Sequence, residues 1–388
     1  MNDIFLDIFQ KQLNKAGEEL CGDQVRMLKT PERTTIVLSD GLSSGVKASI
    51  LATLTTEIIM TMLREEAALR EVIDTVIRTL PVDRERRIAY ATFTILTVDH
   101  RDYSFRIINF DNPPPFYFKN GICTALEMEN QKILNKKITF YRGALELGDF
   151  LGLVSDGVLY AGLGTTMNFG WGWENIARYI QDEVHARPVY AAHTVVNSVM
   201  NTTYRLYGFQ PGDDSTFVGI LGRKRNALLI FSGPPIDDGH DYVYVDRLLE
   251  FGGRKVVCGG TTANIVASFL KTSVETRLDT MRPEIPAIGK LPGIDLVTEG
   301  ILTMAAALEL LRSSKGSLEN IPFDENGAYL LTREMLNADS ITFLVGQSIN
   351  PVYQNPLLPR NISIRRYLIE RIAEVLRTYN KDVQIEYC

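Results

Sequence analysis

The most constraining stretch of this chain is residues 34–63, where an apolar strand ends in an aspartate and leads directly into a helix. Residues 34–38 (Thr-Thr-Ile-Val-Leu) predict a buried strand. Asp40-Gly41 ends that strand, and residues 46–63 carry apolar side chains at helical spacing. An aspartate at a strand tip beside a helix N-terminus suits an ion or a phosphate. An ordinary strand–turn–helix with a solvated aspartate is the alternative.

Three more aspartates stand at predicted strand ends. Gly22-Asp23 opens a strand that runs to about Met27, and a turn at residues 29–33 returns the chain toward Asp40. These two strands can be antiparallel neighbours, which would place Asp23 near Asp40. Asp156 follows the apolar strand 150–155, and Asp213 precedes the apolar strand 216–221. For Asp23, a solvated acid at a strand edge is the alternative.

The rest of the first half alternates strand and helix patterns. Residues 4–20 predict a short helix followed by a strand, and Asn120-Gly121 predicts a hairpin turn between residues 116–118 and 122–124. The further predicted elements are a helix over 66–80, strands over 87–98 and 103–109, and helices over 174–182 and 189–206.

Carboxylates gathered at one end of a sheet repel one another and need cations. Oxygen ligands without nearby His or Cys favour hard ions such as Mg²⁺ or Mn²⁺. Two such ions sharing a water lower the pKa of that water and present hydroxide to a phosphoryl group. The residues therefore predict metal-assisted hydrolysis of a phosphoester.

Size and composition narrow the class of protein. The chain has 388 residues, 45% of them hydrophobic and 23% charged, which predicts a globular protein of two domains. A net charge of −6 argues against nucleic acid as a partner. No apolar window predicts a membrane span and no secretory signal is visible. The four cysteines lack metal-type spacing, so we expect reduced thiols in a cytoplasm.

Residues 15–222 resemble the stage II sporulation protein E branch of the bacterial PP2C (metal-dependent) serine/threonine phosphatases. The similarity rests on five segments in order. These are Gly22-Asp23, residues 39–45 (Ser-Asp-Gly-Leu-Ser-Ser-Gly), residues 91–93 with 107–115, residues 147–158 (Leu-Gly-Asp-Phe-Leu-Gly-Leu-Val-Ser-Asp-Gly-Val), and residues 213–218 (Asp-Asp-Ser-Thr-Phe-Val).

The resemblance implies an α+β fold, an α-β-β-α sandwich of two antiparallel sheets, over residues 1–224. It implies two Mn²⁺ or Mg²⁺ ions, with Asp40 bridging them and Gly41 binding through its carbonyl. Asp40 and Asp156 are then the catalytic residues. The metal ligands are Asp23, Asp40, Gly41, Asp156 and Asp213, with Asp214 as the second choice in the tandem pair.

Three positions depart from the family pattern. Ser43 replaces the second glycine of the Asp-Gly loop. Asp111 and Asn112 replace the usual Gly-His, which limits the transfer of roles in that loop to Asn109. No counterpart of the phosphate-binding arginine of eukaryotic relatives is identified.

Residues 225–388 lie outside the resemblance and predict a smaller α/β domain with a regulatory or sensing role. Its predicted elements are strands over 227–231, 255–258, 340–345 and 382–387, helices over 241–251, 264–270, 298–313, 332–337 and 362–379, and a loop over 276–293. Gly259–Asn264 (Gly-Gly-Thr-Thr-Ala-Asn) links a strand to a helix and could cradle a small-molecule anion, although a packing turn is the alternative. His240 is a further candidate ligand, against a solvated loop histidine.

The sequence thus predicts a cytoplasmic bacterial phosphatase that hydrolyses phosphoserine or phosphothreonine on a signalling regulator through a metal-bridging hydroxide. The alternative is a non-catalytic phosphoprotein-binding protein with a ligand-sensing C-terminal domain. Homodimerisation through helices of either domain stays open. We expect no nucleic-acid and no membrane partner.

Overall fold

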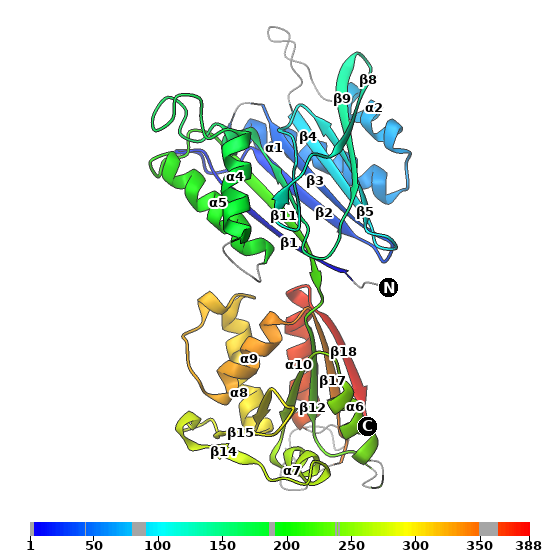
Figure 1. Cartoon of the computed structure of the whole chain (residues 1–388), viewed down its shortest axis with the longest axis vertical. Coiled ribbons are helices and arrows are strands. Elements are labelled where there is room, and N and C mark those ends of the chain that lie inside the picture. The colour runs from blue at the N-terminus through cyan, green and yellow to red at the C-terminus, as the bar shows by residue number, and fades with distance from the viewer. Residues whose placement is uncertain are drawn as a thin grey trace. The chain divides into compact units, whose positions relative to one another are not determined.

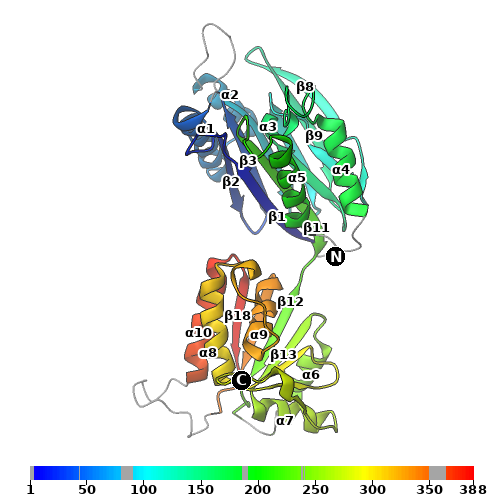
Figure 2. The ribbon, with the colours of Figure 1, turned by 90° about the vertical axis from the view of Figure 1, so that its left-hand side faces the viewer.

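The chain folds into two compact units, Met1–Lys224 and Arg225–Cys388. The computed structural model describes residues 4–42, 44–79, 91–185, 191–236, 239, 241–348 and 364–388. Figures 1 and 2 show the ribbon from two directions.

Two antiparallel sheets form the centre of the first unit. The six-stranded sheet runs in the order β2 (Asp23–Lys29), β3 (Arg33–Gly41), β4 (Ala91–Asp99), β5 (Ser104–Phe110), β9 (Lys136–Ala144) and β8 (Glu127–Ile133). The five-stranded sheet runs in the order β1 (Ile4–Leu13), β11 (Ser215–Lys224), β10 (Phe150–Val154), β6 (Phe116–Lys119) and β7 (Ile122–Cys123).

Helices cover the outer faces of both sheets (Figure 2). α1 (Gly45–Arg64) and α2 (Leu69–Thr79) pack on the six-stranded sheet around Val37 and Ile95. α4 (Trp173–His185) and α5 (Ala192–Leu206) pack on the five-stranded sheet. A third apolar cluster, which includes Leu38 and Ile220, fills the space between the sheets. The α-β-β-α sandwich expected from the sequence is confirmed.

Strand β3 shows why the sequence folds this way. Neighbouring side chains of a strand point to opposite faces. Val37 therefore lies under the helices, whereas Leu38 lies between the sheets, and both are fully buried. A strand buried on both faces needs a continuous apolar run rather than strict alternation. Residues 34–38 supply that run.

Helix α1 carries more apolar residues than its packing against the sheet buries. It is the one helix, within the described ranges, that is long and apolar enough to cross a membrane by composition, with a hydropathy of 1.4. Ala48, Ala52 and Ile59 are fully buried, and Ile59 packs in the apolar cluster between α1 and the sheet. That packing is typical of the core helix of a globular unit.

One prediction for the first unit was wrong, and one hairpin was missed. Residues 4–20 were expected to start with a helix, but Ile4–Leu13 forms strand β1, paired along its length with β11. A short apolar run does not distinguish a helix from a strand until its partner is known. The β8–β9 hairpin was not predicted, because six of the seven residues of β8 are exposed and five of them are polar. The predicted hairpin at Asn120-Gly121 is confirmed.

The second unit contains a seven-stranded sheet with a parallel centre. Its order is β14 (Glu275–Arg277), β15 (Ile288–Lys290), β16 (Leu296–Thr298), β13 (Arg254–Cys258), β12 (Ala227–Ser232), β17 (Ser340–Val345) and β18 (Asp382–Tyr387). The strands from β16 to β18 run parallel. The chain moves outward from β12 in one direction and then in the other, which is a doubly wound arrangement.

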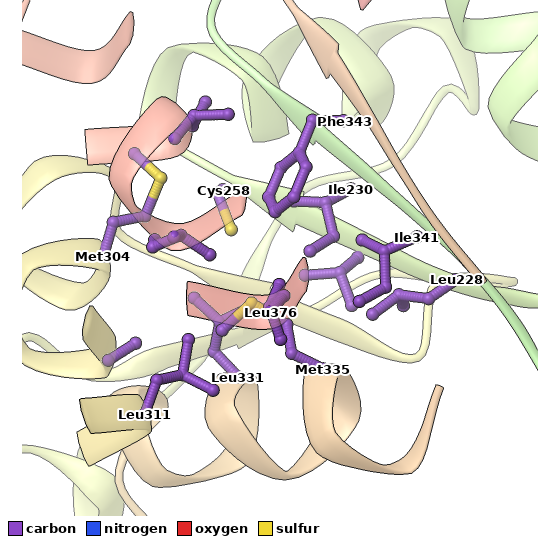
Figure 3. Close-up of a cluster of buried hydrophobic side chains, with 14 of the residues drawn as sticks. Leu228, Ile230, Cys258, Met304, Leu311, Leu331, Met335, Ile341, Phe343 and Leu376 are labelled. Carbon is purple, nitrogen blue, oxygen red and sulfur yellow. The ribbon is translucent and has the colours of Figure 1, made fainter. Parts of the chain in front are cut away.

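Helices lie on both faces of this sheet. α6 (Asp241–Glu250) and α7 (Gly260–Phe269) pack on one face around Phe231 and Leu344. α8 (Ile301–Ser314), α9 (Gly327–Asn337) and α10 (Ile364–Thr378) pack on the other face. Figure 3 shows this second core, in which Phe343 and Ile230 of the sheet meet Met304 and Leu376 of the helices.

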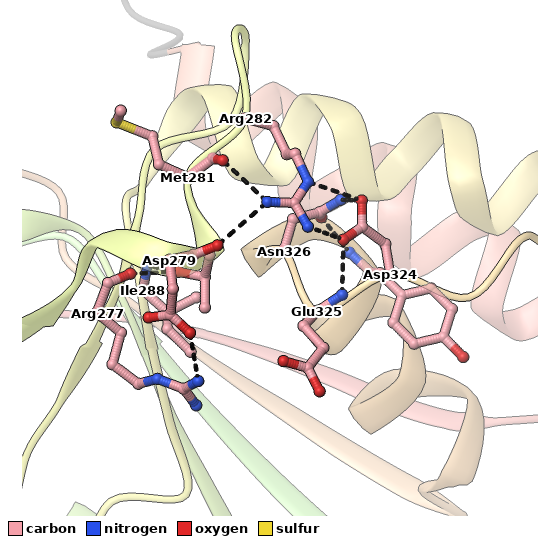
Figure 4. A network of polar contacts seen from close by, with 10 residues as sticks. Arg277, Asp279, Met281, Arg282, Ile288, Asp324, Glu325 and Asn326 are labelled. Carbon is pink, nitrogen blue, oxygen red and sulfur yellow. Dashed lines mark hydrogen bonds and ion pairs between the residues drawn. The ribbon is translucent and has the colours of Figure 1, made fainter.

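Residues 276–293 contain more structure than the loop that the sequence predicted. Two short strands, β14 and β15, pair with each other, and Leu278–Thr280 forms a 3-10 turn between them. Arg282 binds both carboxylate oxygens of Asp324 at 3.2 and 2.5 Å, which ties this segment to the start of α9 (Figure 4). α9 itself begins at Gly327 rather than 332, because Asn326 caps it by accepting from the Tyr329 amide at 2.9 Å.

Candidate active site

Asp23 and Asp40 lie directly opposite each other on neighbouring strands. The antiparallel register of β2 and β3 pairs Asp23 with Asp40. The Gly41 amide donates to the Gly22 carbonyl at 3.2 Å, which closes the end of the ladder. The adjacency of the two acids that the sequence predicted is therefore present in the structure.

Asp156 joins the pair from the other sheet. It is the first residue of α3 (Asp156–Leu159), directly after β10. The Ser155 amide donates to the Thr216 carbonyl at 3.1 Å, which holds the end of β10 against the start of β11. The charge of Asp156 is among the causes that raise the pKa of Asp40, so the two carboxyl groups lie close together. The ends of two sheets thus bring together acids 116 positions apart in the sequence.

Two hydroxyl groups orient the Asp23 carboxylate. Its Oδ2 accepts from Ser155 Oγ at 2.7 Å and from Thr216 Oγ1 at 2.6 Å. Asp23 is fully buried, and its other oxygen, Oδ1, has no hydrogen-bond partner. A buried carboxylate oxygen without a partner is costly, so it marks a place where a cation fits.

The tandem pair Asp213-Asp214 divides into two environments. Asp213 interacts electrostatically with Asp40 and Asp156. Asp214 accepts from the Lys15 amide at 2.9 Å, while its Oδ2 is buried without a partner. Asp214 therefore faces Asp23 and the chain at Lys15, whereas Asp213 faces the centre of the acidic cluster.

Burial and mutual repulsion raise the pKa values of this cluster. Burial, followed by the charges of Asp23 and Asp156, raises the pKa of Asp40 to about 10. Burial also raises the pKa of Asp23 to about 7, against the lowering effect of its hydroxyl donors. The pKa values of Asp156 and Asp213 are raised for the same first reason, burial. The ionised cluster is thus unstable without a compensating positive charge.

The donor set fits hard divalent cations. Asp23, Asp40, Asp156 and Asp213 offer only oxygen, as Mg²⁺ and Mn²⁺ prefer. Among the described residues, no three His, Cys, Asp or Glu side chains form a ready metal cage. The fit therefore lies in the oxygen chemistry of these four carboxylates and in the unpartnered oxygen of Asp23.

Glycines allow the close approaches that shape the site. A Cβ on Gly41 would lie 2.2 Å from the Ala48 carbonyl oxygen, so only glycine lets α1 start this close to the strand. A Cβ on Gly157 would lie 2.1 Å from the Asp214 carbonyl oxygen. Ser44 donates to Glu18 Oε1 at 3.1 Å, which places a further acid beside the Asp-Gly loop. The departure at Ser43 lies outside the described residues.

The proline loop after β5 is held by two asparagines. Asn109 donates to the carbonyls of Asn112 and Pro113 at 3.0 and 2.9 Å and accepts from the Asn112 amide at 3.0 Å. The Asn112 side chain binds Thr94 at 3.0 Å and also accepts from Thr92. Asp111 adopts a left-handed conformation, with φ of 57°. These contacts give Asn109 and Asn112 a structural role in the loop.

Sequence reasoning missed several residues that support the site. Ser155 and Thr216 stand next to predicted ligands, and that position was the only available signal. Tyr207 donates to the Gly157 carbonyl at 2.7 Å, and nothing in its sequence context pointed to this contact. Lys15 contributes only its backbone amide, so its residue type gives no indication of this role.

Comparison with known proteins assigns the first unit to a protein family. Residues 30–221 match the family model described as stage II sporulation protein E. The first unit is a stage II sporulation protein E-type PP2C domain. The match lies within Met1–Lys224 and does not extend into the second unit.

Several solved structures are similar to this PP2C domain. The PP2C domain with part of the regulatory domain of stage II sporulation protein E from Bacillus subtilis is 18% identical, with a TM-score of 0.49 over 57% of this chain. The RsbU and RsbW domains of a Mycobacterium tuberculosis protein are 17% identical, with a TM-score of 0.48 over 63% of this chain and 67% of theirs. RsbX in complex with magnesium is 17% identical, with a TM-score of 0.41 over 57% of this chain and 97% of its own.

The match to the Bacillus subtilis structure spans 62% of that chain. No curated protein sequence matches this chain.

The predicted anion site at Gly259–Asn264 stays a prediction. Gly259, with φ of 126°, precedes α7, and Thr262 accepts from the Gly233 amide at 2.9 Å. Thr262 is thus used in packing between β12 and α7. Thr261 and Asn264 line a cavity of about 570 Å³ beside α6, with Asp241 in its wall. His240 lies outside the described residues.

Proposed function

We propose that the first unit is a Mn²⁺- or Mg²⁺-dependent phosphatase that hydrolyses phosphoserine or phosphothreonine on a bacterial signalling regulator. The observation that carries the proposal is the meeting of Asp23, Asp40 and Asp156 at the ends of two sheets, with a buried carboxylate oxygen left without a partner. Membership of the stage II sporulation protein E family supports the same activity.

Each acid has a proposed role. Asp40 would be the ligand common to the cations, the Gly41 carbonyl would be a further ligand, and Asp23, Asp156 and Asp213 would complete the set. Asp213 is preferred over Asp214 because it faces Asp40 and Asp156, whereas one oxygen of Asp214 is bound by the Lys15 amide. Bound divalent cations would supply a water of lowered pKa and stabilise the negative charge of the transition state.

The remaining residues prepare this ligand set. Ser155 and Thr216 hold the Asp23 carboxylate in one orientation, so that its free oxygen faces the cluster. Tyr207 holds the Gly157 carbonyl, which fixes the first turn of α3 and with it Asp156. Such rigid support lowers the reorganisation that binding and catalysis require.

Kinetics test the proposal. The full chain is assayed with p-nitrophenyl phosphate and with a phosphoserine peptide, in Mn²⁺ and in chelator. Asp40→Asn should lower kcat by roughly 100-fold or more, since the loss of one electrostatic stabiliser typically has that effect. Asp182→Asn is the matched control, because Asp182 is an exposed residue of α4 outside the site.

Two results would reject the proposal. Activity that survives Asp40→Asn would remove the proposed mechanism. The absence of any Mn²⁺-dependent hydrolysis of either substrate by the parent chain would favour the non-catalytic alternative, in which the domain binds a phosphoprotein without cleaving it. For residues 225–388 we propose a regulatory role in the cytoplasm, tested by comparing the activity of residues 1–224 with that of the full chain.

A further inference from the structure

A second pocket lies at the opposite end of the six-stranded sheet from the acidic cluster. It has a volume of about 440 Å³ and is formed by β3, β4, β5 and β9 together with the connection between α1 and α2. Arg33, the first residue of β3, lines it, whereas Asp40 is the penultimate residue of that strand. Seven residues of extended chain span roughly 23 Å. The pocket is therefore separate from the proposed active site.

Three arginines make this pocket positively charged. Arg33, Arg106 and Arg142 all line it. The register of β5 and β9 pairs Arg106 directly with Arg142. Like charges directly opposite each other on neighbouring strands are destabilising. Two neighbouring arginines, even in a chain of net charge −6, therefore need a negatively charged group to offset their mutual repulsion.

Asp99 lies opposite Arg33 and Glu127 lies opposite Arg142 on the neighbouring strands, but neither acid forms an ion pair with these arginines in the described part of the chain. Asp99 is the one acid in the pocket lining, and it is held by Arg101 through bonds of 3.0 and 2.6 Å, which lower its pKa to about 2. Arg142 lies 3.9 Å from Glu129, and both side chains are more than half exposed. Such an exposed pair contributes little.

The other two arginines have no carboxylate partner in the described part of the chain. Arg33 donates to the Leu63 carbonyl at 3.2 Å, so that its charge stays uncompensated. The Arg106 side chain makes no hydrogen bond or ion pair with any described residue. The pocket therefore holds a positive charge that the chain itself leaves available.

An apolar wall faces the arginines. Leu63 and Ala67 come from the end of α1 and the segment after it, and Leu69 begins α2. The C-terminal end of α1 carries a partial negative charge and the N-terminal end of α2 a partial positive charge. These two partial charges oppose each other, so the arginines determine the net charge of the pocket. A volume of 440 Å³ is in the range of small-molecule sites, which combine apolar walls with a few polar groups.

We propose that this pocket binds a phosphorylated small molecule, with its phosphate between Arg106 and Arg142 and its organic part against Leu63 and Leu69. Planar guanidinium groups match the oxygens of a phosphate in pairs. The site is independent of the proposed phosphatase reaction, because none of its residues belongs to the acidic cluster.

Calorimetric titration tests the proposal on the full chain. An Asp40→Asn background in chelator prevents phosphate from binding through metal ions at the acidic cluster. The probes are inorganic pyrophosphate, which has only the charge, and ADP, which adds an organic part. Both should bind, and ADP should bind more tightly.

Charge-matched variants locate the site. Arg106→Gln should weaken both probes by roughly tenfold or more, since a charge-assisted hydrogen bond is lost. Lys132→Gln removes the same charge from the exposed strand β8 and should leave binding unchanged. Arg106→Lys should recover part of the affinity. The unliganded Arg106→Gln protein should not lose thermal stability, because a repulsive neighbour is removed.

Three outcomes would overturn the inference. The first is that neither probe binds at millimolar concentration. The second is that Arg106→Gln and Lys132→Gln weaken the binding of the probes equally. The third is that Arg106→Gln leaves the affinity for ADP unchanged. Pyrophosphate binding as tight as that of ADP would reject the role of the apolar wall and leave a site for a free phosphate.

Discussion

Divalent cations should stabilise the first unit through Asp40. At a Mn²⁺ concentration of 100 times Kd, binding to the folded state alone contributes about 2.7 kcal/mol. For a unit the size of Met1–Lys224, each kcal/mol raises Tm by about 2–4 °C. The expected rise is therefore about 5–11 °C. Asp40→Asn should abolish this rise, because it removes the carboxylate that we propose as the common ligand of the cations.

The metal-free protein should show a matching dependence on pH. Burial and the charges of Asp23 and Asp156 raise the pKa of Asp40 from the ordinary value of an aspartate to about 10. The folded state then binds the proton more tightly than the unfolded state does. Stability is consequently complete at low pH and falls as pH rises from about 4 toward 10, by at most about 1.4 kcal/mol per pH unit for one group.

Calorimetric scans of the full chain at several pH values, with Mn²⁺ or with chelator, measure both effects. Asp40→Asn should be more stable than the parent in chelator at pH 8 and should flatten the pH dependence. Asp182→Asn should behave like the parent. A rise in Tm with Mn²⁺ that persists in Asp40→Asn would refute the reasoning, as would a parent chain that Mn²⁺ does not stabilise.

Three further substitutions test supporting contacts. Gly157→Ala should destabilise the first unit by about 1–3 kcal/mol and lower activity, because its Cβ would meet the Asp214 carbonyl at 2.1 Å; calorimetry and kinetics measure this. Arg254→Met should lower the stability of the second unit by roughly 2 kcal/mol in urea unfolding, because it removes both arginine hydrogen bonds of the buried Glu334 carboxylate and leaves it only the longer ion pair with Arg333 at 3.6 Å. Asn109→Ala should cost about 1–3 kcal/mol in the same assay and leave the rise in Tm with Mn²⁺ intact.

Each of these has a contrary result. Full activity in Gly157→Ala would mean that the approach of α3 to β11 is not required. An unchanged urea midpoint for Arg254→Met would mean that the ion pair contributes nothing net. Loss of the Mn²⁺ response in Asn109→Ala would give that asparagine a place in the metal site rather than in the loop alone.

The part of the site that depends on local pairing could be read from the sequence. The strands that carry Asp23 and Asp40 are joined by a short turn. Antiparallel pairing of two such strands places their outer ends, and with them the two acids, side by side. The convergence of Asp156 and Asp213 depends instead on the pairing of β10 with β11, which are separated by the three helices α3, α4 and α5. Residue patterns do not determine such pairings, so the resemblance to a family was needed to expect them.

Fold prediction failed where partners decide the structure. Ile4–Leu13 is a strand because β11 offers an edge along its whole length, and no local signal reports that edge. Strand β8 is mostly polar and exposed, so the apolar alternation that reveals strands is missing from it. In contrast, the strand of residues 34–38 and the helix that follows are both apolar enough to be recognised alone.

The most direct test of the account is anomalous diffraction at the manganese edge from crystals grown with MnCl₂. The account predicts two peaks within coordination distance of the Asp40 carboxylate, one of them also next to the Gly41 carbonyl, with Asp23, Asp156 and Asp213 around them. Manganese bound elsewhere, or no peak beside Asp40 in a crystal that contains the ordered loop, would contradict the central claim.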